Sequence, residues 1–186
     1  MTTFILHGGR VTHESEANTK FFQEIANRLP DGARVLCCYF ANPTKIVSAH
    51  EHITAHIDAA TEKHFIFEIA DPDPEIFVEQ AGRADALYFH GGTTGLLKDA
   101  LQPIKNLSQL FQDKLVIGTS AGAHMLSRYY YSVMKSELYV GLGILPIKVI
   151  SHYADEYKGQ LEMLKTHGES LETYALQEGE FIVINK

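Results

Sequence analysis

The sequence has little that would point to a membrane protein, a disulfide-linked secreted protein or a nucleic-acid-binding protein. Its 186 residues include no tryptophan and only two cysteines. No apolar run approaches the roughly 18 residues of a transmembrane helix. Acidic residues outnumber basic ones by 23 to 16, the formal charge is −7, and no cluster of lysine and arginine offsets it. Such a chain repels phosphate backbones, so we expect no nucleic-acid partner and no membrane partner.

The two cysteines, Cys37 and Cys38, are neighbours within the apolar run 35–40. Neighbouring residues on a strand point to opposite faces, so we expect two buried thiols that are not linked to each other. The first ten residues also lack the basic region and the long apolar region of a secretory signal. Both features favour a cytoplasmic location, where thiols stay reduced.

The residues that are present describe an ordinary globular chain with alternating strands and helices. Hydrophobic residues make up 45% and charged residues 21%, and the length fits one domain over residues 1–186. Apolar runs predict strands over 3–6, 34–40, 64–69, 85–89, 114–117 and 147–151. Helices are expected over 15–29, 42–61, 74–82, 96–101, 107–111, 123–130 and 159–166, and residues 174–175 with 181–184 predict a closing hairpin. This order predicts an α/β protein, a three-layer sandwich with a mostly parallel central sheet.

The strongest local motif is Gly118-Thr119-Ser120-Ala121-Gly122, which follows a buried strand and precedes a helix. A sharp turn between a strand and a helix forces strained angles on the central residue and presents its hydroxyl at the carboxyl end of the sheet. Ser120 is therefore the candidate nucleophile. The amide of Ala121, at the start of the helix, is a candidate donor to an oxyanion.

A second glycine-rich turn, within Phe89–Leu97, also lies between a strand and a helix. The amide of Gly92 is the better candidate for a second oxyanion donor, and that of Gly91 is the next. Gly91 and Thr93 are candidate substrate-binding residues. The turn is not a phosphate-binding P-loop, because no Gly-Lys-Ser/Thr follows it.

A serine nucleophile needs a base to take its proton and an acid to orient that base. Among ten histidines, His152 is the best candidate for the base, because it follows the predicted strand 147–151 where a loop begins. For the acid, the sequence leaves Glu178 and the pair Asp155 and Glu156 open. His124 lies two residues after Gly122 and is a candidate substrate-binding residue.

Four segments in this order resemble the peptidase E (aspartyl dipeptidase) and cyanophycinase family of serine peptidases. They are Phe89–Thr94 with the following leucines, Gly118–Ala123, Leu142–Pro146 leading to Ser151-His152-Tyr153, and Ala175–Gly179. The resemblance implies a class I glutamine amidotransferase-like (flavodoxin-like) fold and a Ser120–His152–Glu178 triad. It also implies an oxyanion hole of the Gly92 and Ala121 amides, a small peptide substrate and no cofactor. The choice of Glu178 as the acid rests on this resemblance.

The chain departs from the family pattern in the segment after the histidine. Peptidase E carries arginines there, one of which binds the aspartyl side chain of the substrate, whereas residues 157–165 contain no arginine. A lysine holds a carboxylate only as a point charge, so the departure does not favour strict aspartyl specificity.

Two alternatives to a peptidase remain open at this stage. One is a non-catalytic or regulatory protein that keeps the fold. The other is an esterase, which would need its acid between the serine and the histidine, where Glu137 is the sole candidate. No metal site is expected at His50, His52 and His56, because they do not form the zinc-binding motif His-Glu-x-x-His. We expect these histidines to lie on a solvent-exposed face of a helix. A homodimer is also left open.

Overall fold

A six-stranded sheet forms the centre of the computed structural model, which describes residues 1–186. Its strands follow the order β10-β1-β5-β4-β2-β3, and every neighbouring pair is parallel except β10 with β1. The strands are β1 (Thr3–His7), β2 (Arg34–Cys38), β3 (Ile66–Ile69), β4 (Ala86–Phe89), β5 (Leu115–Thr119) and β10 (Phe181–Asn185). The apolar runs of β4 and β5 are buried on both faces, as expected for inner parallel strands.

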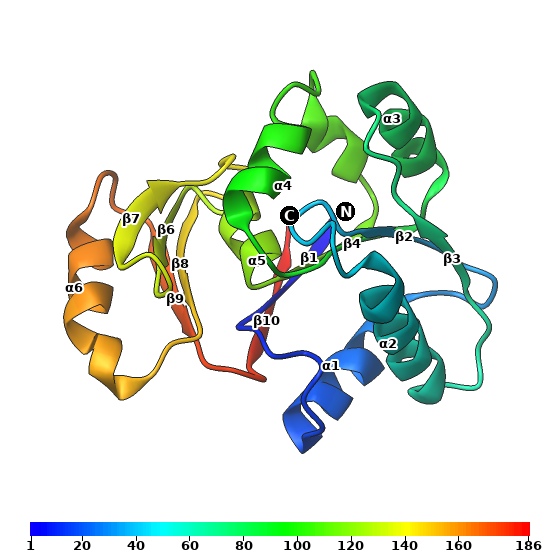
Figure 1. Cartoon of the computed structure of the whole chain (residues 1–186), viewed down its shortest axis with the longest axis horizontal. Coiled ribbons are helices and arrows are strands. Elements are labelled where there is room, and N and C mark those ends of the chain that lie inside the picture. Colours follow the sequence, from blue (N-terminus) through cyan, green and yellow to red (C-terminus); the bar gives the residue numbers. More distant parts are fainter.

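Helices cover both faces of this sheet and make the outer layers of the sandwich (Figure 1). One apolar cluster packs α1 (Glu16–Arg28) and α2 (Ile46–Ala59) against one face. A second cluster packs α3 (Pro74–Arg83), α4 (Thr94–Leu101), α5 (Ala121–Leu126) and the 3-10 helix η1 (Leu107–Phe111) against the other. The expected α/β class with a mostly parallel central sheet is thus confirmed.

A second, four-stranded sheet lies beside the first and was not expected from the sequence (Figure 1). Its order is β7-β6-β8-β9, with β6 (Tyr129–Ser132), β7 (Glu137–Val140), β8 (Ile147–Ser151) and β9 (Glu172–Leu176). The short 3-10 helix η2 (Asp155–Tyr157) and helix α6 (Lys158–Thr166) follow β8, and Leu164 of α6 packs on this sheet.

Two sequence predictions for this region are wrong. The helix expected over 123–130 ends at Leu126, because Ser127 is extended and its hydroxyl bonds the carbonyls of His124 and Tyr129. The tyrosine run then enters strand β6, which suits the β-propensity of aromatic residues. The closing hairpin does not form either. Strand β9 pairs with β8 of the small sheet, whereas β10 pairs with β1 of the large sheet.

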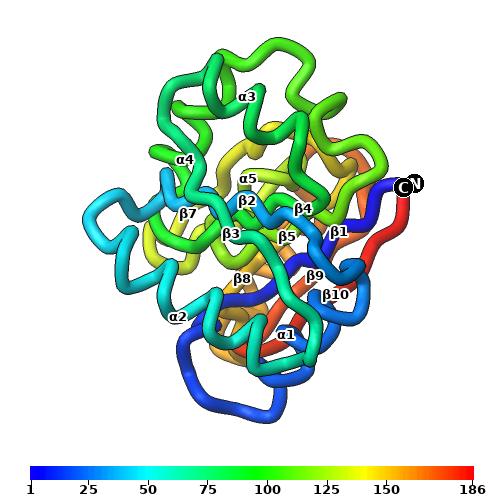
Figure 2. The backbone as a smooth tube through the Cα atoms, turned by 90° about the vertical axis from the view of Figure 1, so that its right-hand side faces the viewer, coloured from blue at the N-terminus to red at the C-terminus, as the bar shows by residue number.

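The crossing from β9 to β10 carries the turn 177–180 over the junction of the two sheets. The last strand then runs back beside the first, and the amide of Thr2 donates to the carbonyl of Lys186. The two termini are therefore adjacent (Figure 2). No helix is long and apolar enough to span a bilayer.

Candidate active site

The candidate site forms where strand ends from both sheets meet. Strand β1 lies between β5 and β10 in the large sheet. At its carboxyl end, three successive carbonyls accept backbone hydrogen bonds from three different loops. The carbonyl of His7 accepts from the amide of Ser120 at 2.9 Å, and that of Gly8 from the amide of His152 at 2.9 Å. The carbonyl of Gly9 accepts from the amide of Gly179 at 3.2 Å. The end of β1 thus fixes the relative positions of these three loops.

Ser120 occupies the sharp turn between β5 and α5. Its backbone, at φ 48° and ψ −101°, lies in a region that non-glycine residues rarely adopt, so the expected strained turn is confirmed. The flanking glycines allow this turn because a Cβ on Gly118 would lie 2.7 Å from the carbonyl carbon of Gly122. A Cβ on Gly122 would in turn lie 2.4 Å from the carbonyl oxygen of Phe89. The glycines of the motif therefore serve the close packing of β5, α5 and β4.

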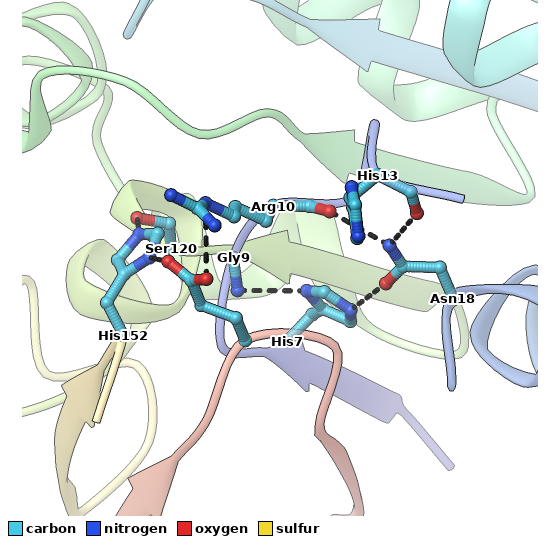
Figure 3. Close-up of polar contacts among 8 residues, drawn as sticks. His7, Gly9, Arg10, His13, Asn18, Ser120 and His152 are labelled. Carbon is cyan, nitrogen blue, oxygen red and sulfur yellow. Dashed lines mark hydrogen bonds and ion pairs between the residues drawn. The ribbon is translucent and has the colours of Figure 1, made fainter. Parts of the chain in front are cut away.

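The side chains of Ser120, His152 and Glu178 form a chain of hydrogen bonds. Figure 3 shows Ser120 beside His152. Ser120 Oγ lies 2.9 Å from His152 Nε2, and His152 Nδ1 lies 3.0 Å from Glu178 Oε1. A carboxylate can only accept, so His152 Nδ1 carries the proton of the second bond. Nε2 of the neutral ring is then free to accept the proton of the serine hydroxyl. His152 is 28% exposed and Glu178 39%, so the group is open to solvent on one side.

Of the carboxylates left open by the sequence, Glu178 is the one that contacts His152. Asp155 and Glu156 lie in η2, where both are exposed. Glu137, the acid required for the esterase alternative, is at the start of β7 and accepts a hydrogen bond from the hydroxyl of Tyr139. The second carboxylate oxygen of Glu178, Oε2, pairs with Arg10 Nε at 3.1 Å.

The glycine-rich turn after β4 lies beside Ser120. A Cβ on Gly91 would be 3.4 Å from Ser120 Cβ, and a Cβ on Gly92, which has φ 146°, would be 2.2 Å from the carbonyl oxygen of Ala41. Gly91 and Gly92 line a small cavity of about 220 Å³ together with Ser120 and His152. No acidic residue lines this cavity. The amide of Ala121, the first residue of α5, has no acceptor within its own helix.

Two larger cavities adjoin the small one. Thr93 and Gly92 line a cavity of about 510 Å³, which extends along α4 toward β6 and has Lys98, Asp99 and Lys135 on its lining. A mostly apolar cavity of about 540 Å³ flanks His152 on the other side and contains Met134, Tyr153 and Tyr157 but no lysine or arginine. Met134, which is 88% exposed in the β6–β7 turn, borders both of these cavities.

His124 does not reach the surface of these cavities and lies beneath them. It is 6% exposed, its ring stacks on Tyr130 with centroids 4.4 Å apart, and its Nε2 accepts from the amide of Ser151. Nδ1 then donates to the hydroxyl of Thr94. Burial lowers the pKa of His124 to about 3, so the ring is neutral. These contacts describe a packing residue that supports the end of β8.

A buried polar network braces the loop that follows β1 (Figure 3). His7 Nε2 donates to Asn18 Oδ1 at 3.0 Å, and His7 Nδ1 accepts from the amide of Gly9 at 3.0 Å. Asn18 Nδ2 donates to the carbonyls of Arg10, at 2.8 Å, and His13, at 2.6 Å. Burial lowers the pKa of His7 to about 4, which keeps the ring neutral and able to accept from Gly9.

Arg10 and Asn18 are the residues of the site that sequence reasoning missed. The clue is a repeated tripeptide, because His-Gly-Gly stands at the carboxyl ends of both β1 and β4. The second copy lies in the glycine-rich turn that the sequence predicts to be part of the site. The first, with the arginine that follows it, becomes informative only once β1 is known to lie next to β5. No group of three or more histidine, cysteine, aspartate or glutamate side chains is arranged to hold a metal ion.

A serine at a strained turn between a parallel strand and a helix is typical of α/β enzymes that hydrolyse their substrates with a serine nucleophile. The model of peptidase family S51 matches residues 4–186, and the chain belongs to this family. It is therefore a serine-type peptidase, a hydrolase acting on peptide bonds. The resemblance found in the sequence is thereby confirmed. None of the curated proteins matches the sequence significantly.

Two solved structures have the same fold. One is a protein assigned as peptidase E from Listeria monocytogenes EGD-e, with 20% identity and a TM-score of 0.69, covering 99% of this chain and 94% of that one. The other is a peptidase from an acI-B1 actinobacterium, also with 20% identity and a TM-score of 0.69, covering 99% of this chain and 83% of that one. At this identity the two structures support the fold alone.

Proposed function

We propose that the protein hydrolyses small peptides through a Ser120–His152–Glu178 triad and an acyl-enzyme. The observation that carries this proposal is the continuous hydrogen-bonded chain from Ser120 Oγ through both ring nitrogens of His152 to Glu178 Oε1. The chain starts at a strained turn that is typical of serine nucleophiles.

In the first half of the reaction, His152 Nε2 takes the proton of Ser120 as Oγ attacks the scissile carbonyl carbon. The amides of Gly92 and Ala121 stabilise the negative charge that develops on the carbonyl oxygen. Glu178 keeps the Nδ1–H tautomer of His152 in place and stabilises the imidazolium. The imidazolium then gives its Nε2 proton to the leaving amine as the peptide C–N bond breaks.

In the second half, water replaces the amine. His152 Nε2 takes a proton from the water, whose oxygen attacks the ester carbonyl carbon of the acyl-enzyme. The tetrahedral intermediate again rests on the amides of Gly92 and Ala121. Its collapse releases the carboxylic acid and returns the proton from His152 to Ser120 Oγ.

The substrate class follows from the cavities around Ser120. Gly91 and Thr93, which line two of them, are proposed to contact the peptide backbone. The cavity beside His152 does not suit an anionic side chain, because it has Glu156 and Glu178 on its lining and no cationic residue. We therefore propose that the enzyme does not require an N-terminal aspartate.

The remaining proposals concern location and partners. Cys37 and Cys38 are free and buried, which is compatible with a reducing cytoplasm. We propose a small peptide as the sole partner needed for the reaction, with no nucleic acid, membrane or cofactor, and we leave a homodimer open.

Labelling with a fluorophosphonate probe, followed by a dipeptide screen, tests the proposed function. The wild type should be labelled and should cleave dipeptides, including some that do not begin with aspartate. Ser120→Ala and His152→Ala should each remove most of the activity, by similar factors, because members of a triad act as a unit. A wild type that is neither labelled nor active would favour a non-catalytic protein. Near-full hydrolysis by Ser120→Ala would contradict the mechanism.

A further inference from the structure

Glu178 has few contacts that could hold its carboxylate in place. It lies in the exposed turn 177–180, outside any strand. Its side chain makes two polar contacts, one with His152 through Oε1 and one with Arg10 through Oε2. The backbone around it is well anchored, because Gly179 donates to Gly9 and the amide of Gly8 donates to the carbonyl of Glu180 at 2.8 Å. The position of the carboxylate on this anchored turn therefore depends on Arg10.

The backbone of Arg10 is fixed by several independent contacts. It has φ 55°, a left-handed conformation that is uncommon for arginine. Its carbonyl accepts from Asn18 Nδ2 at 2.8 Å and from the amide of His13 at 3.0 Å. The preceding Gly9 is bonded to His7 Nδ1. The strained conformation persists because these buried groups stabilise it.

The guanidinium of Arg10 comes from a different element than the arginines of the family pattern, which lie after the histidine. It also lines the cavity that contains Ser120. Because Nε pairs with Glu178 Oε2, its positive charge is already partly compensated in the absence of a substrate.

We propose that Arg10 is a positioning residue of the triad. It holds the Glu178 carboxylate so that Oε1 faces His152 Nδ1, and the His7–Asn18 network holds Arg10. This inference rests on the proposed function, because it gives Arg10 a role only if Glu178 orients a catalytic histidine.

The proposal has a consequence for the dependence of activity on pH. The charges near His152 are Glu178, Glu156 on the lining of the apolar cavity, and Arg10. His7 of β1 and His124 of α5 also face it, but burial lowers both pKa values, and both rings are neutral. Removing the guanidinium of Arg10 leaves the negative charge of Glu178 uncompensated. That charge then stabilises the protonated imidazole of His152 more strongly. The acidic limb of kcat/KM should therefore move to higher pH.

The test compares Arg10→Gln and Arg10→Lys with the wild type, on one neutral dipeptide and one aspartyl dipeptide. The side chain is 68% exposed, so both variants should fold, and thermal unfolding checks this. Arg10→Gln should lower kcat about fivefold on both substrates, the most that an exposed ion pair is expected to contribute. KM should stay unchanged and the acidic limb should shift upward. Arg10→Lys keeps the positive charge, so the acidic limb of its kcat/KM profile should stay at the wild-type pH. Its kcat should lie between those of Arg10→Gln and the wild type.

Two further variants sharpen the test. Arg83→Gln removes a half-exposed arginine that pairs with Glu68 and Glu79 on the far edge of the large sheet, and it should leave kcat unchanged. In a Glu178→Gln background, Arg10→Gln should cause no additional loss, because Arg10 acts through Glu178.

Three results would overturn the proposal while leaving the proposed function intact. One is an Arg10→Gln variant with the kcat of the wild type. Another is an equal loss in the presence and absence of Glu178, which would mean that Arg10 acts independently. The third is an increase in KM confined to the aspartyl dipeptide, which would mean that Arg10 binds the substrate carboxylate directly. An inactive wild type would instead overturn the proposed function, and this inference with it.

Discussion

Gly9, in the loop after β1, lies against the imidazole of His152, and the absence of a Cβ at this position leaves room for the ring. A Cβ at this position would lie 2.2 Å from His152 Cε1 and 2.5 Å from Nε2. Ordinary contacts begin near 3.4 Å, so in Gly9→Ala the imidazole must move by more than about 1 Å. The backbone of His152 cannot follow freely, because its amide is bonded to the carbonyl of Gly8. The ring must therefore leave the position in which its Nε2 lies 2.9 Å from Ser120 Oγ.

The expected magnitude has a catalytic part and a folding part. A displacement of about 1 Å in a catalytic group costs on the order of 10²-fold in rate, so kcat of Gly9→Ala should fall by about that factor. Gly9 also has φ 120°, where an alanine is strained, so the free energy of unfolding should decrease by about 1–3 kcal/mol. The rate of fluorophosphonate labelling should fall together with kcat, because both require a proton to leave Ser120.

The assay combines steady-state dipeptide hydrolysis, probe labelling and urea unfolding. Gly159→Ala is the matched control, since Gly159 lies in α6 with no atom near its added Cβ. This control should keep kcat and gain up to about 1 kcal/mol of stability. A folded Gly9→Ala enzyme with kcat within about threefold of the wild type would refute the reasoning, because the clash would then not control the position of His152.

The remaining predictions concern the choice of acid and the buried histidine. Glu178→Gln should lower kcat by about 10²- to 10⁴-fold, whereas Asp155→Asn should leave it unchanged; the opposite order would show that the loop acid is the partner of His152. Because burial lowers the pKa of His7 from 6.5 to about 4, the unfolded chain binds more protons between those two pH values. The contribution of neutral His7 should therefore be fully present above pH 6.5 and lost as the pH falls to about 4, by up to about 3 kcal/mol. Urea unfolding at several pH values measures this loss, and a His7 C2–H resonance that titrates near pH 6.5 would contradict it.

The sequence was most informative where local pattern and local structure coincide. Apolar runs predicted every strand of the large sheet, although β10 pairs with β1 and not with residues 174–175 as expected. The Gly118–Gly122 motif predicted the strained turn at Ser120. The helix expected over 123–130 failed at Ser127, where side-chain hydrogen bonds to the backbone end α5 early. The periodicity of apolar residues does not reveal these side-chain bonds, because one of them depends on the position of the following strand, β6.

The candidate acid shows the limit of local reasoning. Glu178, Asp155 and Glu156 are equally plausible from the sequence, since each follows His152 and lies in a polar segment. The structure brings Glu178 to His152 because β9 and β10 belong to different sheets, and the turn between them crosses the junction. The path of this turn is set by the pairing of β9 with β8 and of β10 with β1, and not by the residues of the turn.

The sequence by itself determined the fold class and the presence of a serine at a sharp turn between a strand and a helix. Both are consequences of short-range rules: burial sets the apolar runs, and close backbone packing requires glycine around Ser120. Tertiary structure alone decided which carboxylate meets His152, that His124 is a packing residue, and that Arg10 belongs to the site. These outcomes depend on β1 lying beside β5, with its last carbonyls bonded to three distant loops, and strand order is a property of the whole chain.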